Sequence, residues 1–319
     1  MNKYNTIYLS PISNIMFSKL RGDDLLELLT IVENFPFEYR EKLLFDSEVT
    51  FGTEIEYEHA SKYKVTRFID YDYPDWTSKT DGTCNFGGEV SSRILTNNLE
   101  SWQELYDVCS FLRTKRARMY NNASSHVHVS REPLENLNYL RQFLKFYTAY
   151  EFVFFRFACG ELMVPRRKML EFAKPLAFKL YRNMDNINNS EAIYLMIPEL
   201  DKNHAINFET KYDTYEFRAY NGTKFATIRQ NEINFSVSSI LAPSRGLIDE
   251  EFIDYKLKHD FVSPETCMDM YFELCLKSAL ECADMVYNNN LDKVYFLRQY
   301  IKSFKNKGMH IPEGEKVLR

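Results

Sequence analysis

The sequence predicts an α+β protein in which helices pack on the outer face of an antiparallel or mixed sheet. Segments with strand-like alternation come first, and helical segments lie between and after them, without a regular βαβ order. Neither of the standard glycine-rich phosphate loops is present, which argues against a doubly wound nucleotide-binding fold. The order of the elements therefore favours a sheet with one helical face.

Two periodicities locate the elements along the chain. Alternation of apolar and polar residues indicates a strand, and apolar residues three and four apart indicate a helix. The expected strands are 49–57, 84–95, 126–130, 204–209 and 214–220. The expected helices are 23–34, 100–119, 134–160, 266–287 and 291–305, in a chain that is nearly all helical from 226 onward.

The chain is expected to form one domain over residues 1–319, because no linker rich in Gly, Pro or Ser and no internal repeat divides it. Its core motifs lie in 50–240, and residues 245–305 form a C-terminal helical scaffold. Hydrophobic residues make up 45% of the chain, with 25 Phe and 22 Tyr, so the core should be large and aromatic. In the scaffold, Cys275 and Cys282 are expected to be buried and unpaired.

Charge and hydropathy limit the kinds of partner that the chain is expected to bind. The net charge of −5 gives no electrostatic case for binding nucleic acid or an anionic membrane. No apolar stretch approaches the roughly 20 residues that span a bilayer, and the first 20 residues lack a signal-peptide pattern. The six cysteines form no CxxC motif and are read as reduced thiols of a cytoplasmic protein.

Residues 52–58 read GTEIEYE and form the first motif that carries chemistry. On a strand, Glu54, Glu56 and Glu58 point to one face, with neighbours about 6.6 Å apart. Each adjacent pair repels by about 0.6 kcal/mol in water and by roughly 2.5 kcal/mol at an effective dielectric of 20. The run therefore forms either a solvated strand face or a cleft that holds a cation.

The segment GGEVSS at residues 87–92 places Glu89 and Ser91 on one strand face, directly after two glycines. Glycines at a strand start permit a bulge or a close approach of the backbone to a neighbour. Taken alone, the segment also fits an ordinary hairpin strand with one polar face. The segment matters because Glu89 adds another carboxylate to those of the first motif.

The segment SSHVHVS at residues 124–130 places His126, His128 and Ser130 on one strand face and two valines on the other. Paired imidazoles at this spacing are less often structural than a single histidine. Two histidines are able to ligate zinc, but the many acids in the other motifs favour a harder ion that prefers oxygen ligands. A purely structural pair remains an open alternative.

The last strand motif joins INFE at residues 206–209 with TYEFRAYNGT at residues 214–223. Glu216 and Arg218 share a face there, and Asn207 precedes them in the first segment. A cross-strand Glu–Arg arrangement on an exposed sheet is the simpler reading of this segment alone. Further cations are Lys79, before the Asp81-Gly82 turn, and Arg166 or Arg167, near an expected helix start; these also fit a solvated surface.

Taken together, the motifs support a functional site more strongly than any one of them does alone. Four strands each present a carboxylate or an imidazole on the face opposite their apolar residues, and arginine and lysine stand near them. Acidic oxygens are the ligands that magnesium prefers, and arginine and lysine are the usual phosphate contacts. The combination predicts a sheet face that binds divalent metal and phosphate.

The order GTEIEYE, KTDGT with GGEVSS, SSHVHVS, then INFE with YEFRAYNGT resembles the amidoligase family, over about residues 50–240. That family is similar in fold to glutamine synthetase and γ-glutamylcysteine synthetase, which are carboxylate–amine ligases. The resemblance implies a curved, mainly antiparallel sheet that carries ATP and two or three Mg²⁺ ions, which Mn²⁺ can replace. It also implies a bacterial or bacteriophage source, with a glutamine amidotransferase-like protein as an expected partner.

The resemblance further assigns roles to individual residues. The implied metal ligands are Glu54, Glu56, Glu89, His126 and Glu216. Contacts to nucleotide or phosphate are implied for His128, Ser130 and Arg218, and Arg166 or Arg167 matches an arginine at the reacting phosphate. From their places in the motifs, Asn207 is added as a nucleotide contact, and Lys79 joins Arg218 and Arg166 as a cation that acts on the reacting phosphate. Two departures concern the substrate more than the metal: Ser124-Ser125 replaces a frequent glycine, and Arg93 replaces a common proline.

The implied reaction is the ATP-dependent joining of a small-molecule or peptide carboxylate to an amine through an acyl phosphate. Two other classes stay open: a metal-dependent phosphotransferase or hydrolase on the same scaffold, and a non-catalytic viral binding or structural protein. The retained carboxylates, His126 and Arg218 argue against the last class, because a decayed site would lose its ligands first. For the proton acceptor, Asp70, Asp72 and Asp75 are candidates by proximity alone.

Overall fold

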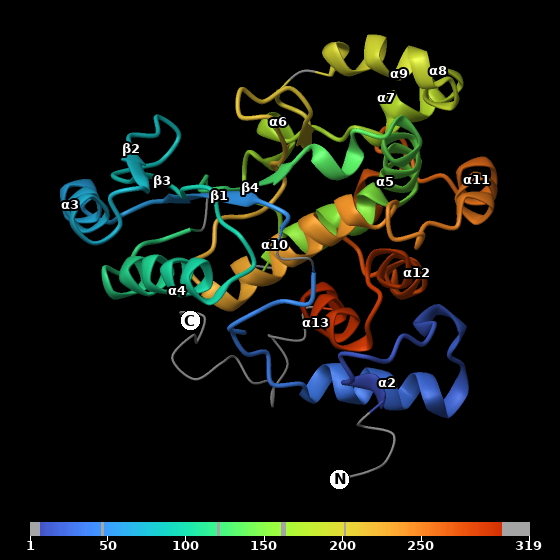
Figure 1. Cartoon of the computed structure of the whole chain (residues 1–319), viewed down its shortest axis with the longest axis horizontal. Helices are drawn as coiled ribbons and strands as arrows, with labels where there is room; N and C mark the ends of the chain where they lie inside the picture. The colour runs from blue at the N-terminus through green and yellow to red at the C-terminus, as the bar shows by residue number, and fades with distance from the viewer. Residues whose placement is uncertain (1–6, 46–47, 120–121, 161–163, 201, 302–319) are drawn as a thin grey trace.

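A computed structural model describes residues 7–45, 48–119, 122–160, 164–200 and 202–301. These residues form an α+β fold around a six-stranded antiparallel sheet in the order β2-β3-β1-β4-β6-β5 (Figure 1). The strands are β1 (Phe51–Tyr57), β2 (Thr77–Lys79), β3 (Gly88–Ser91), β4 (Ser125–Ser130), β5 (Ile206–Asn207) and β6 (Thr214–Phe217). The α+β class and the antiparallel sheet predicted from the sequence are therefore confirmed.

The register of the sheet decides which side chains meet. Strand β1 lies between β3 and β4, and it pairs Glu56 with Glu89 on one side and Glu54 with His126 on the other. Next along the sheet, β4 pairs His128 with Glu216 of β6. Because alternate residues of a strand share a face, all of these polar side chains project from the same side of the sheet.

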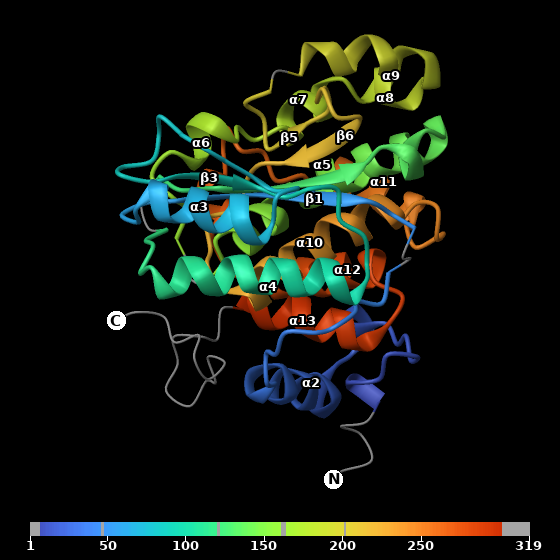
Figure 2. The same ribbon diagram turned by 60° about the vertical axis from the view of Figure 1, so that its left-hand side comes forward.

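The opposite face of the sheet is apolar and packs on helices. Ile55, Val90, Val127 and Val129 are fully buried there. The helices on this side include α4 (Leu99–Thr114), α10 (Ala226–Leu241) and α13 (Asn290–Ile301), as Figure 2 shows. Helix α10 contacts both β1 and β4, so it supports the two central strands from behind.

Short helices also lie beyond the polar face, which corrects the prediction that helices cover one face only. The helices α6 (Met169–Phe172), α7 (Ala177–Arg182), α8 (Met184–Asn188) and α9 (Ser190–Met196) lie on the side of the sheet away from α10, near β5 and β6 (Figures 1 and 2). A hydrogen bond from Lys174 N to Asn203 O and the bridge between Lys174 and His204 tie this segment to the chain before β5. The polar face is therefore bordered at its β5–β6 end.

Several predicted elements are confirmed, with small shifts in their ends. Helix α2 (Gly22–Asn34) and helix α5 (Leu137–Ala158) match the predictions closely. The expected strand 84–95 is reduced to β3, and its first residues lie in a loop where Phe86 adopts a positive φ of 50°. The sequence did not indicate α3 (Lys62–Asp72) or the short edge strand β2.

The C-terminal scaffold differs from the prediction at its start. Only a 3-10 turn (Met268–Tyr271) lies in 266–275, and α12 (Leu276–Val286) begins after it, following α11 (Glu250–His259). Cys275 is the N-cap residue of α12 and is partly exposed, so the expectation of its burial was wrong. Cys282 lies inside the helix and is buried and free, as expected. The predicted end of the last helix, 302–305, lies outside the described residues.

Helix α5 is the longest described helix, with 22 residues. Although most of it is buried, it carries the ionisable residues Lys145, Glu151 and Arg156. Among the described residues, no helix combines the length and the hydropathy needed to cross a membrane. The burial of α5 reflects packing against other helices, including α7, α11 and α12.

Candidate metal centre

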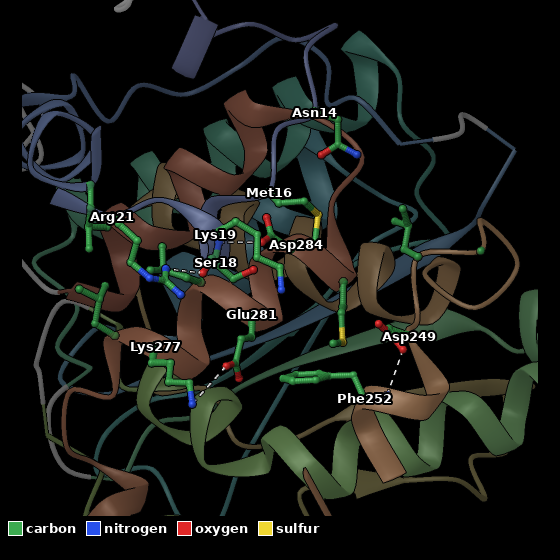
Figure 3. Close-up of a pocket in the computed structure, with 16 residues that line it drawn as sticks. Asn14, Met16, Ser18, Lys19, Arg21, Asp249, Phe252, Lys277, Glu281 and Asp284 are labelled. Atoms are coloured by element: carbon green, nitrogen blue, oxygen red, sulfur yellow. Dashed lines mark hydrogen bonds and ion pairs between the residues drawn. The ribbon is translucent and has the colours of Figure 1, made fainter. Parts of the chain in front are cut away.

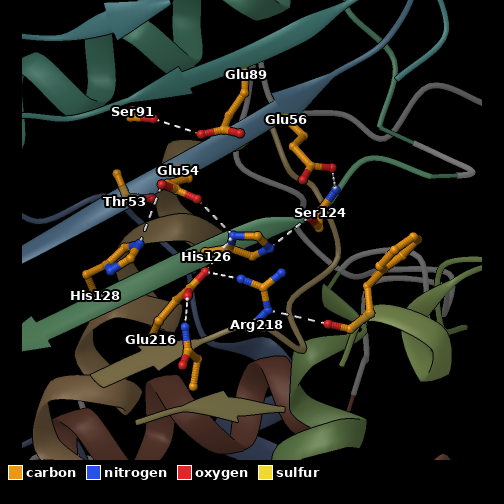
Figure 4. A network of polar contacts seen from close by, with 12 residues as sticks. Thr53, Glu54, Glu56, Glu89, Ser91, Ser124, His126, His128, Glu216 and Arg218 are labelled. Carbon is orange, nitrogen blue, oxygen red and sulfur yellow. Dashed lines mark hydrogen bonds and ion pairs between the residues drawn. The ribbon is translucent and has the colours of Figure 1, made fainter. Parts of the chain in front are cut away.

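Six acidic or imidazole side chains converge on the polar face of the sheet (Figure 4). They come from four strands that are distant in sequence but adjacent in the sheet. The side chains are Glu54 and Glu56 from β1, Glu89 from β3, His126 and His128 from β4, and Glu216 from β6. The structure therefore brings together all five side chains that were predicted as metal ligands, together with His128, although His126 belongs to neither of the two groups with metal-site spacing described below.

The imidazole of His126 lies at the centre of this face. Its Nδ1 is 2.9 Å from Oε2 of Glu54 and 3.0 Å from Oε1 of Glu216, and its Nε2 is 3.1 Å from Oγ of Ser124. Burial and the charge of Arg218 lower the pKa of His126, but the two carboxylates outweigh them and raise it to about 9. His126 is thus an imidazolium that joins two carboxylates at neutral pH.

The two carboxylates beside His126 are held in their ionised form. Burial alone would raise the pKa of Glu216, but the hydrogen bond and charge of His126 and the charge of Arg218 lower it to about 2. Burial opposes ionisation of Glu54 as well, yet the hydrogen bond with His126 and the proximity of His128 hold the pKa of that carboxyl far below its usual range. Negative charge therefore persists on this face over the whole physiological pH range.

The surroundings of His128 fit those of a metal ligand. Its Nδ1 is 3.1 Å from Oγ1 of Thr214, which orients the ring. Its Nε2 is buried and has no hydrogen-bond partner within the described residues, and it lies 3.6 Å from Oε1 of Glu54. Buried polar atoms are nearly always satisfied, so an orphaned nitrogen that faces a carboxylate fits a metal ligand.

Two groups of three side chains have the spacing of a metal site. Glu54, His128 and Glu216 offer ligand atoms that all lie within 4.8 Å of one another. A second group, Glu56, Asp81 and Glu89, meets the same criterion. A set with one imidazole and a set with carboxylates only both suit hard divalent ions such as Mg²⁺ or Mn²⁺.

Neighbouring groups fix the second set in place. Oε2 of Glu56 accepts a bond from the backbone N–H of Ser124 at 2.7 Å, and Oε1 of Glu89 accepts one from Oγ of Ser91 at 2.8 Å. Burial and the nearby charge of Glu54 raise the pKa of Glu89. That direction is expected where carboxylates crowd together and lack a full counter-charge.

Two cations face the carboxylates directly. Nζ of Lys79 lies 2.8 Å from Oε1 of Glu89 and 3.9 Å from Oε1 of Glu54. The guanidinium of Arg218 bonds to Oε1 of Glu216 and donates to the carbonyl of Phe172 at 3.4 Å. The structure thus places Lys79 and Arg218, both predicted to act on phosphate, at opposite ends of the same polar face.

Glycines at the start of β3 make this arrangement sterically possible. A Cβ atom added to Gly87 would lie 1.7 Å from the carbonyl oxygen of Tyr57, and one added to Gly88 would lie 2.6 Å from that of Lys79. Side chains at these positions would push β3 away from β1 and β2. The close backbone approach that the sequence left open is therefore present, and it sets the position of Glu89.

Three residues that were predicted to contact nucleotide or phosphate form hydrogen bonds to other protein groups in this structure. Arg166 is buried, and its guanidinium donates to the carbonyls of Arg218, Ala219 and Tyr220 at 2.9–3.1 Å. Asn207 donates to Oε2 of Glu216 at 2.9 Å, so it orients a metal ligand. Ser130 stands at the end of β4, where its Oγ accepts from the N–H of Glu132 at 3.3 Å.

Sequence reasoning missed Asp81 as a member of the site. The motif indicated a turn at Asp81-Gly82, and that turn folds beside β2 so that the Asp81 carboxylate joins Glu56 and Glu89. By contrast, the suggested proton acceptors Asp70, Asp72 and Asp75 all occupy exposed positions on α3 or just after it. Glu58, the third glutamate of the motif, follows the end of β1; it is buried and accepts from the N–H of Asn85 at 3.2 Å.

A separate pocket of about 750 Å³ lies among the helices, away from the polar face of the sheet (Figure 3). Its lining includes Leu25, Phe252, Leu280, Glu281 and Asp284. Both acids already have cationic partners: Lys256 is 2.9 Å from Glu281, and Lys293 is 2.8 Å from Asp284. These carboxylates therefore hold the helices together, and the sheet face remains the better candidate for chemistry.

Comparison of the sequence with family models and with curated proteins finds no match in either. The residues of the polar face and the resemblance of its motifs are therefore the features that point to a function.

Proposed function

We propose that this chain is an ATP- and Mg²⁺-dependent carboxylate–amine ligase with a glutamine synthetase-like catalytic fold. The observation that carries the proposal is the convergence of two sets of metal-ligand geometry, Glu54–His128–Glu216 and Glu56–Asp81–Glu89, on one antiparallel sheet face. The motif order that resembles the amidoligase family adds the reaction class. The antiparallel sheet and its polar face are compatible with that likeness.

The residues present fit divalent metal. Carboxylate oxygens dominate both sets, and the orphaned Nε2 of His128 lacks the partner that a metal ion would provide. An ion held there would act as a Lewis acid that offsets negative charge on phosphate oxygens. Ser91, Ser124, Asn207 and Thr214 orient the ligands through hydrogen bonds, as outer groups of metal sites commonly do.

The chain's own cations suit the transfer of a phosphoryl group. In the proposed reaction, the terminal phosphoryl group of ATP passes to a substrate carboxylate and ADP leaves. An amine then attacks the acyl carbon, an amide forms, and phosphate and a proton are released. Arg218 and Lys79 would stabilise the charge on the transferred phosphoryl group, because both flank the carboxylate cluster and remain partly exposed.

Trapping with hydroxylamine tests this function. An acyl phosphate is open to any strong nucleophile in the site, so hydroxylamine should replace the natural amine. With ATP, Mg²⁺ and a panel of amino acids and short peptides, we expect hydroxamate together with ADP and phosphate. Glu54→Gln should abolish hydroxamate formation, because it removes one metal ligand, whereas Glu33→Gln, an exposed change on α2, should not.

The same assay separates the two other classes. A phosphotransferase or hydrolase would release ADP without hydroxamate, and a binding protein would release neither product. Release of ADP that is insensitive to the carboxylate panel would contradict the ligase proposal and favour the phosphotransferase. Tighter binding and greater stabilisation by Zn²⁺ than by Mg²⁺ or Mn²⁺ would instead indicate a zinc enzyme.

A further inference from the structure

A fully buried arginine on α10 lies directly behind the polar face of the sheet. The side chain of Arg229 has no exposed surface, and it reaches from α10 to both central strands. Its Nε donates to Oγ1 of Thr53 on β1 at 2.7 Å, and its Nη2 donates to the carbonyl oxygen of His126 on β4. One guanidinium therefore bonds to both strands that carry the central ligands.

Arg229 contacts β1 and β4 at the same positions along the strands as the proposed metal ligands. Thr53 precedes Glu54 on β1, and Glu54 pairs directly with His126 on β4. The Glu54 carboxylate and the His126 imidazole project from one face, while Arg229 bonds to the strands from the other. A change in the spacing of β1 and β4 would thus move Glu54 relative to His126 and His128.

The charge of Arg229 is balanced inside the protein. Its Nη1 donates to Oε2 of Glu232 at 2.7 Å, and neither side chain is exposed. Tyr220 packs under the guanidinium, with its ring centroid 5.8 Å from Cζ, and its hydroxyl bonds to Ser236 of the same helix. Each of the three guanidinium nitrogens thereby bonds to a different element.

A buried ion pair of this kind is a poor source of net stability. Desolvation of both charges offsets their attraction, and well-packed apolar residues of similar volume often serve the fold equally well. A guanidinium with three fixed partners does, however, define geometry, which apolar packing defines less sharply. The pair is therefore better explained by the position it imposes on β1 and β4 than by stability.

We propose that Arg229 is a positioning residue that sets the spacing of β1 and β4, and thereby the affinity of the polar face for divalent metal. This inference rests on the proposed function, because it takes Glu54 and His128 to be metal ligands. Hydrogen-bonding groups just outside a metal site commonly change metal affinity by 10- to 100-fold when they are lost. Arg229 acts one step further out, through two strands, without touching the ligand atoms.

Titration of the full-length protein with Mn²⁺ by calorimetry tests the proposal. The main variant is the double change Arg229→Met and Glu232→Met, which removes both buried charges together and avoids leaving either unpaired. We expect this variant to keep a native circular dichroism spectrum and to bind Mn²⁺ about 10-fold more weakly than wild type. Arg229→Lys keeps the charge but lacks the planar fork, so it should also weaken Mn²⁺ binding even if the double variant does not fold.

The control is Arg298→Met on α13. Arg298 is as fully buried as Arg229 but lies on α13. Its Nε donates to the carbonyl of Phe35, which belongs to none of the strands that carry the polar face. This variant should lose thermal stability yet retain the Mn²⁺ affinity of wild type. Wild-type affinity in folded Arg229→Lys or in the folded double variant would overturn the positioning proposal alone. Failure of wild type to bind millimolar Mn²⁺ would overturn the metal site itself, so the two failures are distinguishable.

Discussion

Nδ1 of His126 lies 2.9 Å from Oε2 of Glu54, across the register pair that joins β1 and β4. The same nitrogen lies 3.0 Å from Glu216, so one proton on His126 neutralises charge between two carboxylates. A divalent ion bound to Glu54 and Glu216 would neutralise the same charge. The protonation of His126 is consequently linked both to stability and to metal binding.

The stability of the metal-free protein should fall as pH rises from about 6.5 to about 9. The pKa of His126 is raised to about 9 in the folded protein, against an ordinary value of 6.5. A group with a raised pKa contributes stability that is complete below its unfolded pKa and is lost as pH rises through its folded pKa. The loss should be on the order of 1–3 kcal/mol, measured by urea unfolding across this pH window.

His126→Asn provides the control for that experiment. The variant should be less stable than wild type at neutral pH, because Glu54 and Glu216 each lose one of their cationic partners. Its unfolding free energy should vary much less between pH 6.5 and 9. An equal slope in both proteins would assign the pH dependence to other groups and contradict the imidazolium described here.

Lys79→Met should bind Mn²⁺ more tightly than wild type while supporting less hydroxamate formation. The ammonium of Lys79 neutralises Glu89 and Glu54, so it competes with a metal ion for their charge. The gain in affinity should be no more than about fivefold, because Lys79 is half exposed and exposed ion pairs contribute roughly 1 kcal/mol or less. Calorimetric titration measures the affinity, with Lys64→Met on α3 as the matched control. Weaker Mn²⁺ binding by Lys79→Met would show that the lysine supports the ligands and does not compete.

Arg218→Ala should lower ATP-dependent turnover by about 100-fold while the circular dichroism spectrum stays native. Arg218 contacts Glu216 and the carbonyl of Phe172, so its removal leaves the sheet hydrogen bonds intact. Arg167→Ala, an exposed change close in sequence to Arg166, should leave turnover unaltered. If nucleotide binding and turnover survive in Arg218→Ala, the arginine is a structural partner of Glu216 and the phosphate assignment is wrong.

Much of the polar face could be predicted because strand alternation is a local property. Glu54, Glu56, Glu89, His126 and Glu216 each lie on a segment whose apolar residues alternate with them. Alternation assigns each side chain to a face of its own strand. It does not say which strands are neighbours, so the pairing of Glu54 with His126 required the structure or a family resemblance.

The missed features depend on contacts distant in sequence. Asp81 belongs to a turn, where no periodicity indicates the direction of its carboxylate. Helix α10 is buried on every side and carries Arg229 and Glu232 among its residues, so it lacks the apolar stripe that identifies a surface helix. The guanidinium of Arg166 was expected at phosphate, but its local sequence does not reveal the backbone carbonyls that it meets.

Anomalous diffraction from crystals soaked with Mn²⁺ and a non-hydrolysable ATP analogue would locate bound metal on the polar face. We predict a manganese peak among Glu54, His128 and Glu216 and another among Glu56, Asp81 and Glu89. We also predict that phosphate oxygens lie between these peaks and the side chains of Arg218 and Lys79. A map without manganese on this sheet face, at millimolar Mn²⁺ and with the analogue present, would contradict the proposed metal centre.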